Sequence, residues 1–593
     1  MVNSGNQNVR EGSAVFRTIG ILILLVAAAA SSVAAQVLSV TDFGAAGDGK
    51  TDDTAAFQKA LDEAGKAPGT RVSVPIGNFL IAGSLRIPAG VTLEGVWQSP
   101  TAFMHNTGTI LLVTGGAGNE NGTPFITMAT NSTLKGVAIF YPEQRRDKAP
   151  PIAYPWTIRG GPGDNISVID VLAVNPYRLL DLTGAGRHYV RGLYGQPLRL
   201  GIRVDECYDV GRIENCHLWP FYTGWLNEFK ELNDWMLQNA VAFEFARTDW
   251  QYVHNTFCFG YAVGYRFTQS KAGPCNGNFL GIGADCCRRP VLVEATQPGG
   301  LLITNAELVG AWGTTDSVGI EVLPGARGKI SLTNSTFWGP LDRCVWVRSD
   351  DAWFTANAVD FGRFDIGAVT SPAVQADGGR LILTGNTFGE GSVHVLVGEK
   401  VRSAILTANQ AAGGLMVDNR AGAKTQMVAN EQPDVVLSGR DLEHYRVQVG
   451  AEGDQRFVRR FHGRESMPST FAHQTMRWSR DRSTLALPVV PGKRYALTLQ
   501  VMVPESALEP EAGIYLGDQR LAGISKSGEQ TLQVVIPPQK RDTVVLTLRC
   551  RGWIPRDTLP GSSDQRTLGI ALYTITMRAA GASGTPVNAT VPR

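Results

Sequence analysis

Short apolar segments bounded by turn residues recur through most of this 593-residue chain. Many of them end in asparagine, as in Ile303-Thr304-Asn305 and Leu332-Thr333-Asn334. Successive steps of 29, 23, 29, 23 and 21 residues separate Asn305, Asn334, Asn357, Asn386, Asn409 and Asn430. Short strands at such a period are typical of a solenoid in which each repeat forms one coil.

The recurring asparagine has a structural explanation. Asparagine tolerates left-handed backbone conformations, and its side chain can hydrogen-bond to the same residue on the next coil. We therefore predict a ladder of stacked turns in a parallel β-helix. A β-propeller is the rival fold, but its blades would be longer. Earlier members of the series are Asn215, Asn255 and Asn278, with steps of 40, 23 and 27 residues.

The 40-residue step exceeds every other step, so it predicts an insertion. We place the extra residues within 221–236, a segment that carries two Trp, two Phe and one Tyr. Insertions in solenoids emerge as loops on one face, which is often the binding face.

The segment Asp42–Thr54 predicts how the solenoid begins. Its glycines permit tight turns, and Thr51 or Asp52 can cap a helix that starts near Asp53. The helical pattern that follows is amphipathic, with one apolar face. That face must cover the open end of the first coil, because an uncovered terminal coil would expose a sheet edge. Its members are Phe57, Ala60, Leu61 and Ala64.

A change of pattern near Pro433 ends the solenoid, which we place at residues 36–435. From 440 to 580, segments such as 495–501, 531–536 and 543–548 alternate apolar and polar residues as half-buried strands do. They predict an antiparallel β-sandwich. The last residues, 581–593, lack periodicity and are expected to form a loose tail.

Residues 1–35 read as a secretory signal peptide. Arg10 and Arg17 precede a short apolar run, and a small-residue cleavage site follows at Val33-Ala34-Ala35. An uncleaved membrane anchor is the alternative, although the apolar run is short for a membrane span. We expect a mature protein that is secreted or periplasmic and has no membrane contact after cleavage.

Seven of the eight cysteines lie between Cys207 and Cys344, and Cys550 stands alone. Their spacing fits no zinc pattern, so we predict no metal site and interpret the cysteines as disulfides between coils. The net charge of +2 gives no reason to expect a nucleic-acid partner.

The segment Asp42–Gln58 resembles the start of the pectate-lyase/polygalacturonase-like superfamily of secreted right-handed parallel β-helix proteins. The resemblance covers about residues 37–430 and implies a protein that handles polysaccharides. The C-terminal part resembles jelly-roll carbohydrate-binding modules. The Asn-Thr-Asp, Asp-Asp and Gly-His-Gly patterns of polygalacturonases are absent at matching coils, as is the Trp-Ile-Asp-His phrase of pectate lyases. No catalytic residue is therefore carried over.

Glycoside hydrolysis needs two carboxylates, one protonated and one ionised. The stretch 203–316 supplies carboxylates beside aromatic residues, and we take Asp205, Asp249 and Asp285 as the acid/base candidates. Asp285 and Trp312 each lie seven residues after a series asparagine, so we expect them on adjacent coils beside Tyr222. The sugar-stacking candidates are Tyr222, Trp225, Trp235, Trp250 and Trp312.

These features predict an exported glycoside hydrolase that needs no cofactor and acts on a polysaccharide. In the C-terminal sandwich, Trp478 and Trp553 are possible sugar contacts. One alternative is a calcium-assisted uronate lyase that uses Asp205, Glu206 and Asp209 as metal ligands. The other is a non-catalytic glycan-binding protein. The oligomeric state is unknown, although a trimer is possible.

Overall fold

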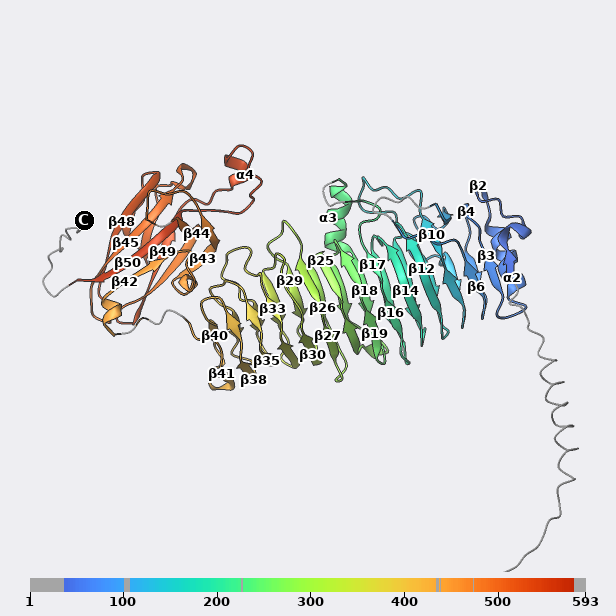
Figure 1. The fold of residues 1–593 in the computed structure, drawn as a ribbon, viewed down its shortest axis with the longest axis horizontal. Helices are drawn as coiled ribbons and strands as arrows, with labels where there is room; N and C mark the ends of the chain where they lie inside the picture. Colours follow the sequence, from blue (N-terminus) through green and yellow to red (C-terminus); the bar gives the residue numbers. More distant parts are fainter. Residues whose placement is uncertain are drawn as a thin grey trace, which may run out of the picture.

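The structure is a computed structural model that describes residues 37–100, 107–224, 228–433, 437, 439–472 and 474–580. The predicted signal peptide, the predicted tail and Trp225 lie outside the described residues. Figure 1 shows an elongated solenoid followed by a separate group of antiparallel strands.

Two long parallel sheets run the length of the solenoid, which confirms the parallel β-helix. The first sheet has thirteen strands, which are β5 (Leu85–Ile87), β8 (Ile126–Met128), β11 (Trp156–Gly160), β13 (Arg178–Thr183), β15 (Leu200–Asp205), β18 (Val241–Phe245), β21 (Val263–Phe267), β26 (Arg289–Val293), β29 (Val318–Val322), β31 (Arg343–Val347), β34 (Val374–Ala376), β37 (Val395–Val397) and β40 (Val417–Asn419).

The second sheet bends at a corner within each coil. Its strands are β1 (Val37–Ser39), β2 (Asp48–Asp52), β3 (Arg71–Ser73), β4 (Gly77–Ile81), β6 (Thr92–Glu94), β7 (Thr109–Val113), β9 (Thr133–Lys135), β10 (Val137–Phe140), β12 (Ser167–Ala173), β14 (Tyr189–Gly195), β16 (Arg212–Glu214), β17 (His217–Leu218), β19 (Gln251–His254), β20 (Phe257–Phe259), β24 (Gly277–Leu280), β25 (Gly283–Cys287), β27 (Leu301–Thr304), β28 (Glu307–Gly310), β30 (Gly328–Thr333), β32 (Ala352–Asn357), β35 (Arg380–Thr384), β38 (Ser403–Thr407) and β41 (Thr425–Val428). Short pairings add β33 (Asp360–Phe361), β36 (Thr387–Phe388), β39 (Gln410–Ala411), β22 (Gln269–Ser270) and β23 (Gly273–Pro274).

Neighbouring coils pair in register, so like positions stack along the solenoid axis. Ile202, Phe243 and Tyr265 occupy one such column inside the coil. The rings of Phe243 and Tyr265 are parallel within 4°, with centroids 4.7 Å apart. Columns of this kind form one continuous apolar core through the solenoid.

The N-terminal helix forms as predicted. Helix α2 (Thr54–Ala64) buries Phe57, Ala60, Leu61 and Ala64 and packs against β3 and β5 at the end of the solenoid (Figure 1). The Asp52 carboxylate accepts a hydrogen bond from the backbone N–H of Thr54, the first residue of the helix, at 3.0 Å, whereas the N-cap residue Asp53 forms no side-chain hydrogen bond to the helix. Asp53 instead points back and accepts the N–H groups of residues 46 and 47 in the glycine-rich turn.

The asparagine series is two ladders that lie one position apart. In the outer ladder Asn215, Asn255, Asn305 and Asn334 themselves adopt left-handed conformations, and the Asn334 amide donates to Asn305 at 2.8 Å. In the inner ladder the preceding residue is left-handed, so the asparagine turns inward. Its members are the buried Asn386 and Asn409, followed by Asn430.

Asn278 and Asn357 do not belong to the two ladders. Asn357 ends β32, and the next residue, Ala358, is the left-handed one. Asn278 lies within β24 opposite Tyr252, and Gly281 takes the left-handed corner position in that coil. The sequence pattern placed Asn278 at a corner because the true corner residue of that coil is a glycine. Glycine adopts the left-handed conformation even more readily than asparagine, so no asparagine marks this corner.

The disulfide prediction is wrong for this structure, because all eight cysteines are buried free thiols. They fill core positions as small apolar side chains. The longest coil is confirmed as an insertion, since helix α3 (Lys230–Asn239) stands out from the solenoid within it (Figure 1).

The C-terminal strands are antiparallel, as predicted, and hydrogen-bond into one sheet with its own apolar core. The long strand β44 pairs with β50 at one end and with β49 at the other, so it joins the two halves of the sheet. The strands are β42 (His444–Gln448), β43 (Val458–Ser466), β44 (Thr475–Pro488), β45 (Tyr495–Val503), β46 (Gly513–Leu516), β47 (Gln519–Gly523), β48 (Gly528–Ile536), β49 (Thr543–Arg549) and β50 (Ala571–Ala579), with a short helix α4 (Pro555–Thr558).

Trp478 and Trp553 are core residues rather than surface contacts. They are 6% and 8% exposed and pack edge to face with ring centroids 5.7 Å apart. The Trp553 indole donates to the carbonyl of Gly569 at 2.9 Å. Neither ring offers a face to a sugar.

The antiparallel sheet contacts the last coils of the solenoid. The buried Arg477 pairs with Asp454 of its own module at 2.8 Å and with Glu390 of the solenoid at 3.1 Å. Among the described residues, no helix is both long enough and apolar enough to cross a membrane.

Asn409→Ala should destabilise the solenoid by about 3 kcal/mol, because it leaves several buried polar groups without partners. Asn409 donates to Leu383 and Asn430 and accepts from Asn386, at 2.8–3.0 Å through its side-chain amide groups. The exposed Asn357 is the matched control, and Asn357→Ala should change stability by less than about 0.5 kcal/mol. Urea unfolding midpoints compare the two, and equal losses would contradict the inner ladder.

Candidate functional site

One outward-facing row of the second sheet gathers chemically active side chains. Each residue of this row lies two positions after a left-handed corner, and the coils pair the row in register. In order along the solenoid, the row contains Tyr194, His217, Phe257, Gly283, Glu307, Thr336, Asp360 and Thr387.

Two carboxylates in and beside this row hold indole N–H groups. Trp312 donates to Asp285 at 3.3 Å, and Trp338 donates to Glu307 at 2.6 Å. The indole rings lie 6.1 Å apart, and the two side chains are 43% and 44% exposed. Exposed indole faces beside carboxylates form a surface on which a sugar ring can stack.

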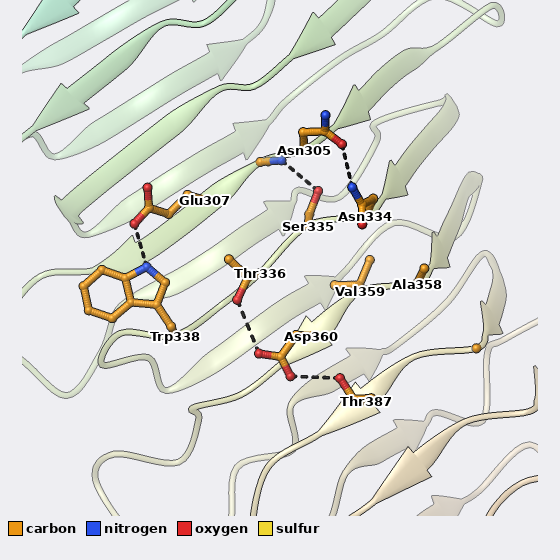
Figure 2. Close-up of a pocket in the computed structure, with 12 residues that line it drawn as sticks. Asn305, Glu307, Asn334, Ser335, Thr336, Trp338, Ala358, Val359, Asp360 and Thr387 are labelled. Atoms are coloured by element: carbon orange, nitrogen blue, oxygen red, sulfur yellow. Dashed lines mark hydrogen bonds between the residues drawn. The ribbon is translucent and has the colours of Figure 1, made fainter.

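An open groove of about 800 Å³ lies directly beside these residues. Glu307, Trp338 and Asp360 line it, together with Thr336 and Thr387 (Figure 2). Asp360 accepts hydrogen bonds from the Thr336 and Thr387 hydroxyls at 3.3 and 2.9 Å. The groove therefore has carboxylate and hydroxyl groups on its floor and an indole at its edge.

Glu307 and Asp360 are two coils apart in the row, with Thr336 between them. Adjacent strands lie about 4.8 Å apart, so their Cα atoms are separated by about 10 Å. Thr336 therefore separates the two carboxylates along the row.

The pKa of the Asp285 carboxyl is raised above its ordinary value of 3.8. Burial is the main cause, because partial removal from water disfavours the charged form. The nearby Glu307 carboxylate adds to the rise, while the hydrogen bond from Trp312 opposes it. A carboxyl with a raised pKa keeps its proton to higher pH, as a general acid requires.

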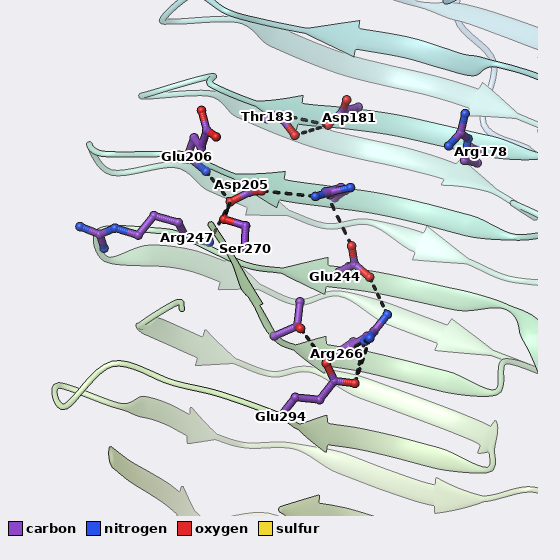
Figure 3. Close-up of polar contacts among 12 residues, drawn as sticks. Arg178, Asp181, Thr183, Asp205, Glu206, Glu244, Arg247, Arg266, Ser270 and Glu294 are labelled. Atoms are coloured by element: carbon purple, nitrogen blue, oxygen red, sulfur yellow. Dashed lines mark hydrogen bonds and ion pairs between the residues drawn. The ribbon is translucent and has the colours of Figure 1, made fainter. Parts of the chain in front are cut away.

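None of Asp285, Glu307 and Asp360 forms an ion pair with a described residue, whereas the carboxylates of the first sheet do. There the outward column alternates in sign through Arg159, Asp181, Arg203, Glu244 and Arg266. Figure 3 shows this second group, in which Arg266 bridges Glu244 and Glu294 at 3.1 and 2.9 Å. Neutralised carboxylates of this kind stabilise coils and are poorly suited to proton transfer.

Asp205 belongs to that structural group. It is 3% exposed and accepts hydrogen bonds from the backbone of Glu206 at 2.8 Å and the hydroxyl of Ser270 at 2.8 Å (Figure 3). The backbone N–H of Arg247 adds a third at 3.1 Å. With its oxygens occupied, Asp205 holds the end of β15 in place.

Asp249 lies near Asp205 but far along the coil from Asp285. It follows β18 and forms a two-point ion pair with Arg247 at 2.6 and 3.0 Å. Trp250 occupies the same corner, where its backbone N–H donates to the side-chain oxygen of Asn276 at 2.6 Å. The structure therefore brings Asp205 and Asp249 together around Arg247 and leaves Asp285 on another face.

The other aromatic candidates do not surround Asp285 either. Tyr222 is 4% exposed and donates its hydroxyl to the Gln144 carbonyl at 2.5 Å, so its ring offers no face to a sugar. Trp235, on α3, is half-buried against the main core. The placement of Tyr222 beside Asp285 and Trp312 was wrong, but the contact between Asp285 and Trp312 is confirmed.

The residues proposed as calcium ligands have separate partners. Asp209 forms an ion pair with Arg187 at 2.6 Å, Asp205 is turned inward, and Glu206 is exposed. Among the described residues, no three His, Cys, Asp or Glu side chains are placed to hold one metal ion.

Glu307, Trp338 and Asp360 escaped the sequence analysis. The count of seven residues after an asparagine began at Asn278, which is not a corner residue. Counting two residues after each left-handed corner instead gives Glu307 from Asn305 and Thr336 from Asn334. Asp360 follows the left-handed Ala358, a corner that no asparagine marks.

Asp285→Asn should stabilise the folded protein at neutral pH. Folding raises the pKa of this carboxyl, so its protonation favours the folded state. Its contribution to the free energy of unfolding is therefore complete below about pH 3.8 and is lost as the pH rises through the pKa of the folded state. A neutral amide avoids that loss and can still accept from Trp312. The gain in unfolding temperature should be larger at pH 8 than at pH 4. Asp249→Asn, which breaks an ion pair, should give no gain, and a pH-independent effect of Asp285→Asn would contradict the assignment.

Comparison with known proteins finds a match to a family profile in the N-terminal segment. Residues 37–145 match the family profile described as rhamnogalacturonase A/epimerase, pectate lyase-like. This range contains the glycine-rich turn, α2 and the first coils, and it ends before the groove.

Short segments also match curated proteins. A stretch of 72 residues is 42% identical to alginate lyase 7 of Azotobacter vinelandii and covers 11% of this chain and 8% of that protein. A stretch of 84 residues is 38% identical to mannuronan C5-epimerase AlgE3 of the same organism, over 13% of this chain and 5% of that protein. A third match, of 58 residues at 43% identity, is to the pre-neck appendage protein of Bacillus phage B103, over 10% and 6%. The matches thus span less than a tenth of each relative.

Solved structures with a similar chain path include gene product 12 of bacteriophage phi29, at 15% identity and a TM-score of 0.46 over 70% of this chain and 60% of that one. The tailspike protein of E. coli bacteriophage HK620, in complex with a pentasaccharide, matches at 10% identity and a TM-score of 0.43 over 91% and 93%. The resemblance of this chain to the pectate-lyase/polygalacturonase-like superfamily of parallel β-helix proteins is confirmed, and the family profile supports it over residues 37–145.

Proposed function

We propose that this protein is an exported glycoside hydrolase that cleaves a polysaccharide in the groove beside Asp285, Glu307 and Asp360. The observation that carries the proposal is the set of three carboxylates on one outward face that form no ion pair with any residue the structure describes, flanked by two exposed indoles. Two carboxyl groups in different environments are the requirement for acid/base cleavage of a glycosidic bond.

Asp285 is the general acid in this proposal. Its raised pKa allows it to hold a proton that it can donate to the oxygen of the leaving sugar. The Trp312 indole N–H donates to one oxygen of this carboxyl at 3.3 Å.

Glu307 is the ionised partner that activates water or attacks the sugar carbon. It is half-buried and accepts a hydrogen bond from the Trp338 indole N–H at 2.6 Å. Asp360, held by two threonine hydroxyls, completes the polar floor and orients sugar hydroxyls.

Two indoles would position the substrate. Trp312 and Trp338 lie tilted at 50° to one another beside the carboxylates and are 43% and 44% exposed, and the Arg363 guanidinium lies over the Trp312 ring at 5.7 Å. Stacking of a sugar ring on an indole is worth on the order of 1 kcal/mol beyond simple burial of area.

The matched relatives support polysaccharide chemistry in general but not one reaction. Those named as enzymes are a lyase and an epimerase, and another is a phage appendage protein. The choice of hydrolysis therefore depends on the carboxylates of the groove. A calcium-assisted uronate lyase remains the alternative reaction.

One observation favours a second candidate function, non-catalytic glycan binding. Asp285 and Glu307 each hold an exposed indole in place, and a binding protein could use them only for that purpose. Both candidates use the same groove, so an activity assay separates them.

Product analysis tests the reaction. The purified mature protein is incubated with neutral and acidic polysaccharides, with and without a chelator, while reducing ends and unsaturated-uronate absorbance are followed together. Hydrolysis predicts reducing ends without that absorbance and no effect of the chelator. Absorbance that disappears with the chelator would support the lyase, and retained binding without any product would support the binding protein.

Asp285→Asn and Glu307→Gln should each lower kcat by about 10²- to 10⁴-fold, with substrate binding retained. Removing the proton of Asp285 by raising the pH should have the same effect, so activity should fall on the alkaline side of the profile. Asp249→Asn is the matched control and should keep the activity of the unchanged protein. Equal activity of all three variants would exclude this site from catalysis.

A further inference from the structure

Aromatic side chains continue the groove toward the N-terminal end of the solenoid. Tyr194, His217 and Phe257 occupy the same outward row as Glu307, in the three coils before Gly283. Trp97 packs beside Tyr194 with ring centroids 5.9 Å apart. We call Trp97, Tyr194, His217 and Phe257 the aromatic lane.

The lane is continuous and only partly covered. Centroid distances are 6.3 Å from Tyr194 to His217 and 5.1 Å from His217 to Phe257, and all four side chains are half-buried. From Tyr194 to Asp360 the row takes six steps of about 4.8 Å, or about 29 Å along the solenoid axis. A row of this length suits an extended chain molecule rather than a single small sugar.

The lane carries no charge. Tyr194, Phe257 and Trp97 are neutral, and burial lowers the pKa of His217, so its imidazole is uncharged at neutral pH. A glycan would therefore be held there by stacking on ring faces and not by ion pairs.

The groove itself repels anions. Glu307 and Asp360 in the groove and Asp285 beside it have no ion pair among the described residues, and the exposed Arg363, 5.7 Å from the ring of Trp312, is the cation we find beside them. With Asp285 protonated, as in the proposed function, two negative charges against one positive charge leave a formal charge of −1. A polyuronate would bring further carboxylates against this surface, at a cost that rises as the salt concentration falls.

We propose that the groove and the aromatic lane together bind one uncharged polysaccharide chain, which runs along the solenoid axis from Trp338 to Trp97. The position of the cleavage point in this chain rests on the proposed function, but the lane and the preference for an uncharged glycan do not require catalysis.

Calorimetric titration tests the proposal with the full-length chain carrying Asp285→Asn, so that the ligand is not consumed. The probes are glucan, mannan, xylan and galactan oligosaccharides of four and eight sugars, with galacturonate and alginate oligosaccharides of the same lengths. The tightest ligand should be uncharged, and its eight-sugar form should bind about tenfold more tightly than its four-sugar form.

Tyr194→Ala should abolish the gain from four to eight sugars and leave four-sugar binding unchanged. The matched control is Tyr252→Ala, because Tyr252 is also half-buried and outward-facing but lies on β19, before the Asn255 corner. That variant should bind both lengths as before. A uronate as the tightest ligand, no dependence on length, no binding to any probe, or equal effects of the two tyrosine variants would overturn the proposal.

Failure of the lane and failure of the catalytic site give different results. Trp312→Ala should weaken the binding of both lengths, because this indole holds Asp285 and packs beside Trp338 at the edge of the groove. If eight-sugar ligands bind no more tightly than four-sugar ligands, but Trp312→Ala still weakens binding, the lane alone is rejected. Full binding in Trp312→Ala and Trp338→Ala variants would reject the groove, and with it the proposed function.

Discussion

Hydrogen bonding in register between successive coils is the constraint on which the rest of the structure depends. Because each strand pairs with the same strand of the next coil, every residue lies about 4.8 Å from its counterpart. A side chain is therefore always part of a column, inside or outside the solenoid. Inside, like residues stack well, as Phe243 and Tyr265 do. Outside, like charges in adjacent coils would repel one another.

The two outward faces avoid repulsion between like charges in different ways. The difference distinguishes the first sheet, whose carboxylates stabilise the coils, from the groove face, to which we assign the function. On the first sheet charges alternate from Arg159 to Arg266, so each carboxylate has a cation beside it. On the groove face Glu307 and Asp360 are kept apart by Thr336, an uncharged residue. Carboxylates left without cations reduce stability, and a protein that keeps them on one face beside exposed indoles is well arranged to bind and protonate a ligand.

Sequence patterns predicted the solenoid, its cap and the antiparallel C-terminal strands because these depend on local periodicity. The four apolar positions of α2 followed directly from helical spacing. The site was harder, because the corner residue changes identity from Asn305 to Gly281 and Ala358, and a one-residue error moves a side chain to the opposite face. Asp285 was found with its true neighbour Trp312, whereas Glu307 and Asp360 could be placed only once the register between coils was known.

The burial of each side chain also shows which residues of one type are available to a ligand, and composition does not show this. Trp312 and Trp338 are exposed, while Trp478 and Trp553 fill the C-terminal core. Asp205 ends β15 and pairs with Arg203, whereas Asp285 lies within β25, has no ion pair with a described residue and carries a raised pKa. Long-range packing, which a single sequence does not encode locally, sets these environments.

The most direct test of this account is a crystal structure of the Asp285→Asn variant with the tightest-binding oligosaccharide. We predict sugar rings on the faces of Trp312 and Trp338, with a glycosidic oxygen within hydrogen-bonding distance of residue 285. Sugar bound instead along the alternating charges of β15, β18 and β21, or at the corner formed by Asp205 and Asp249, would contradict it.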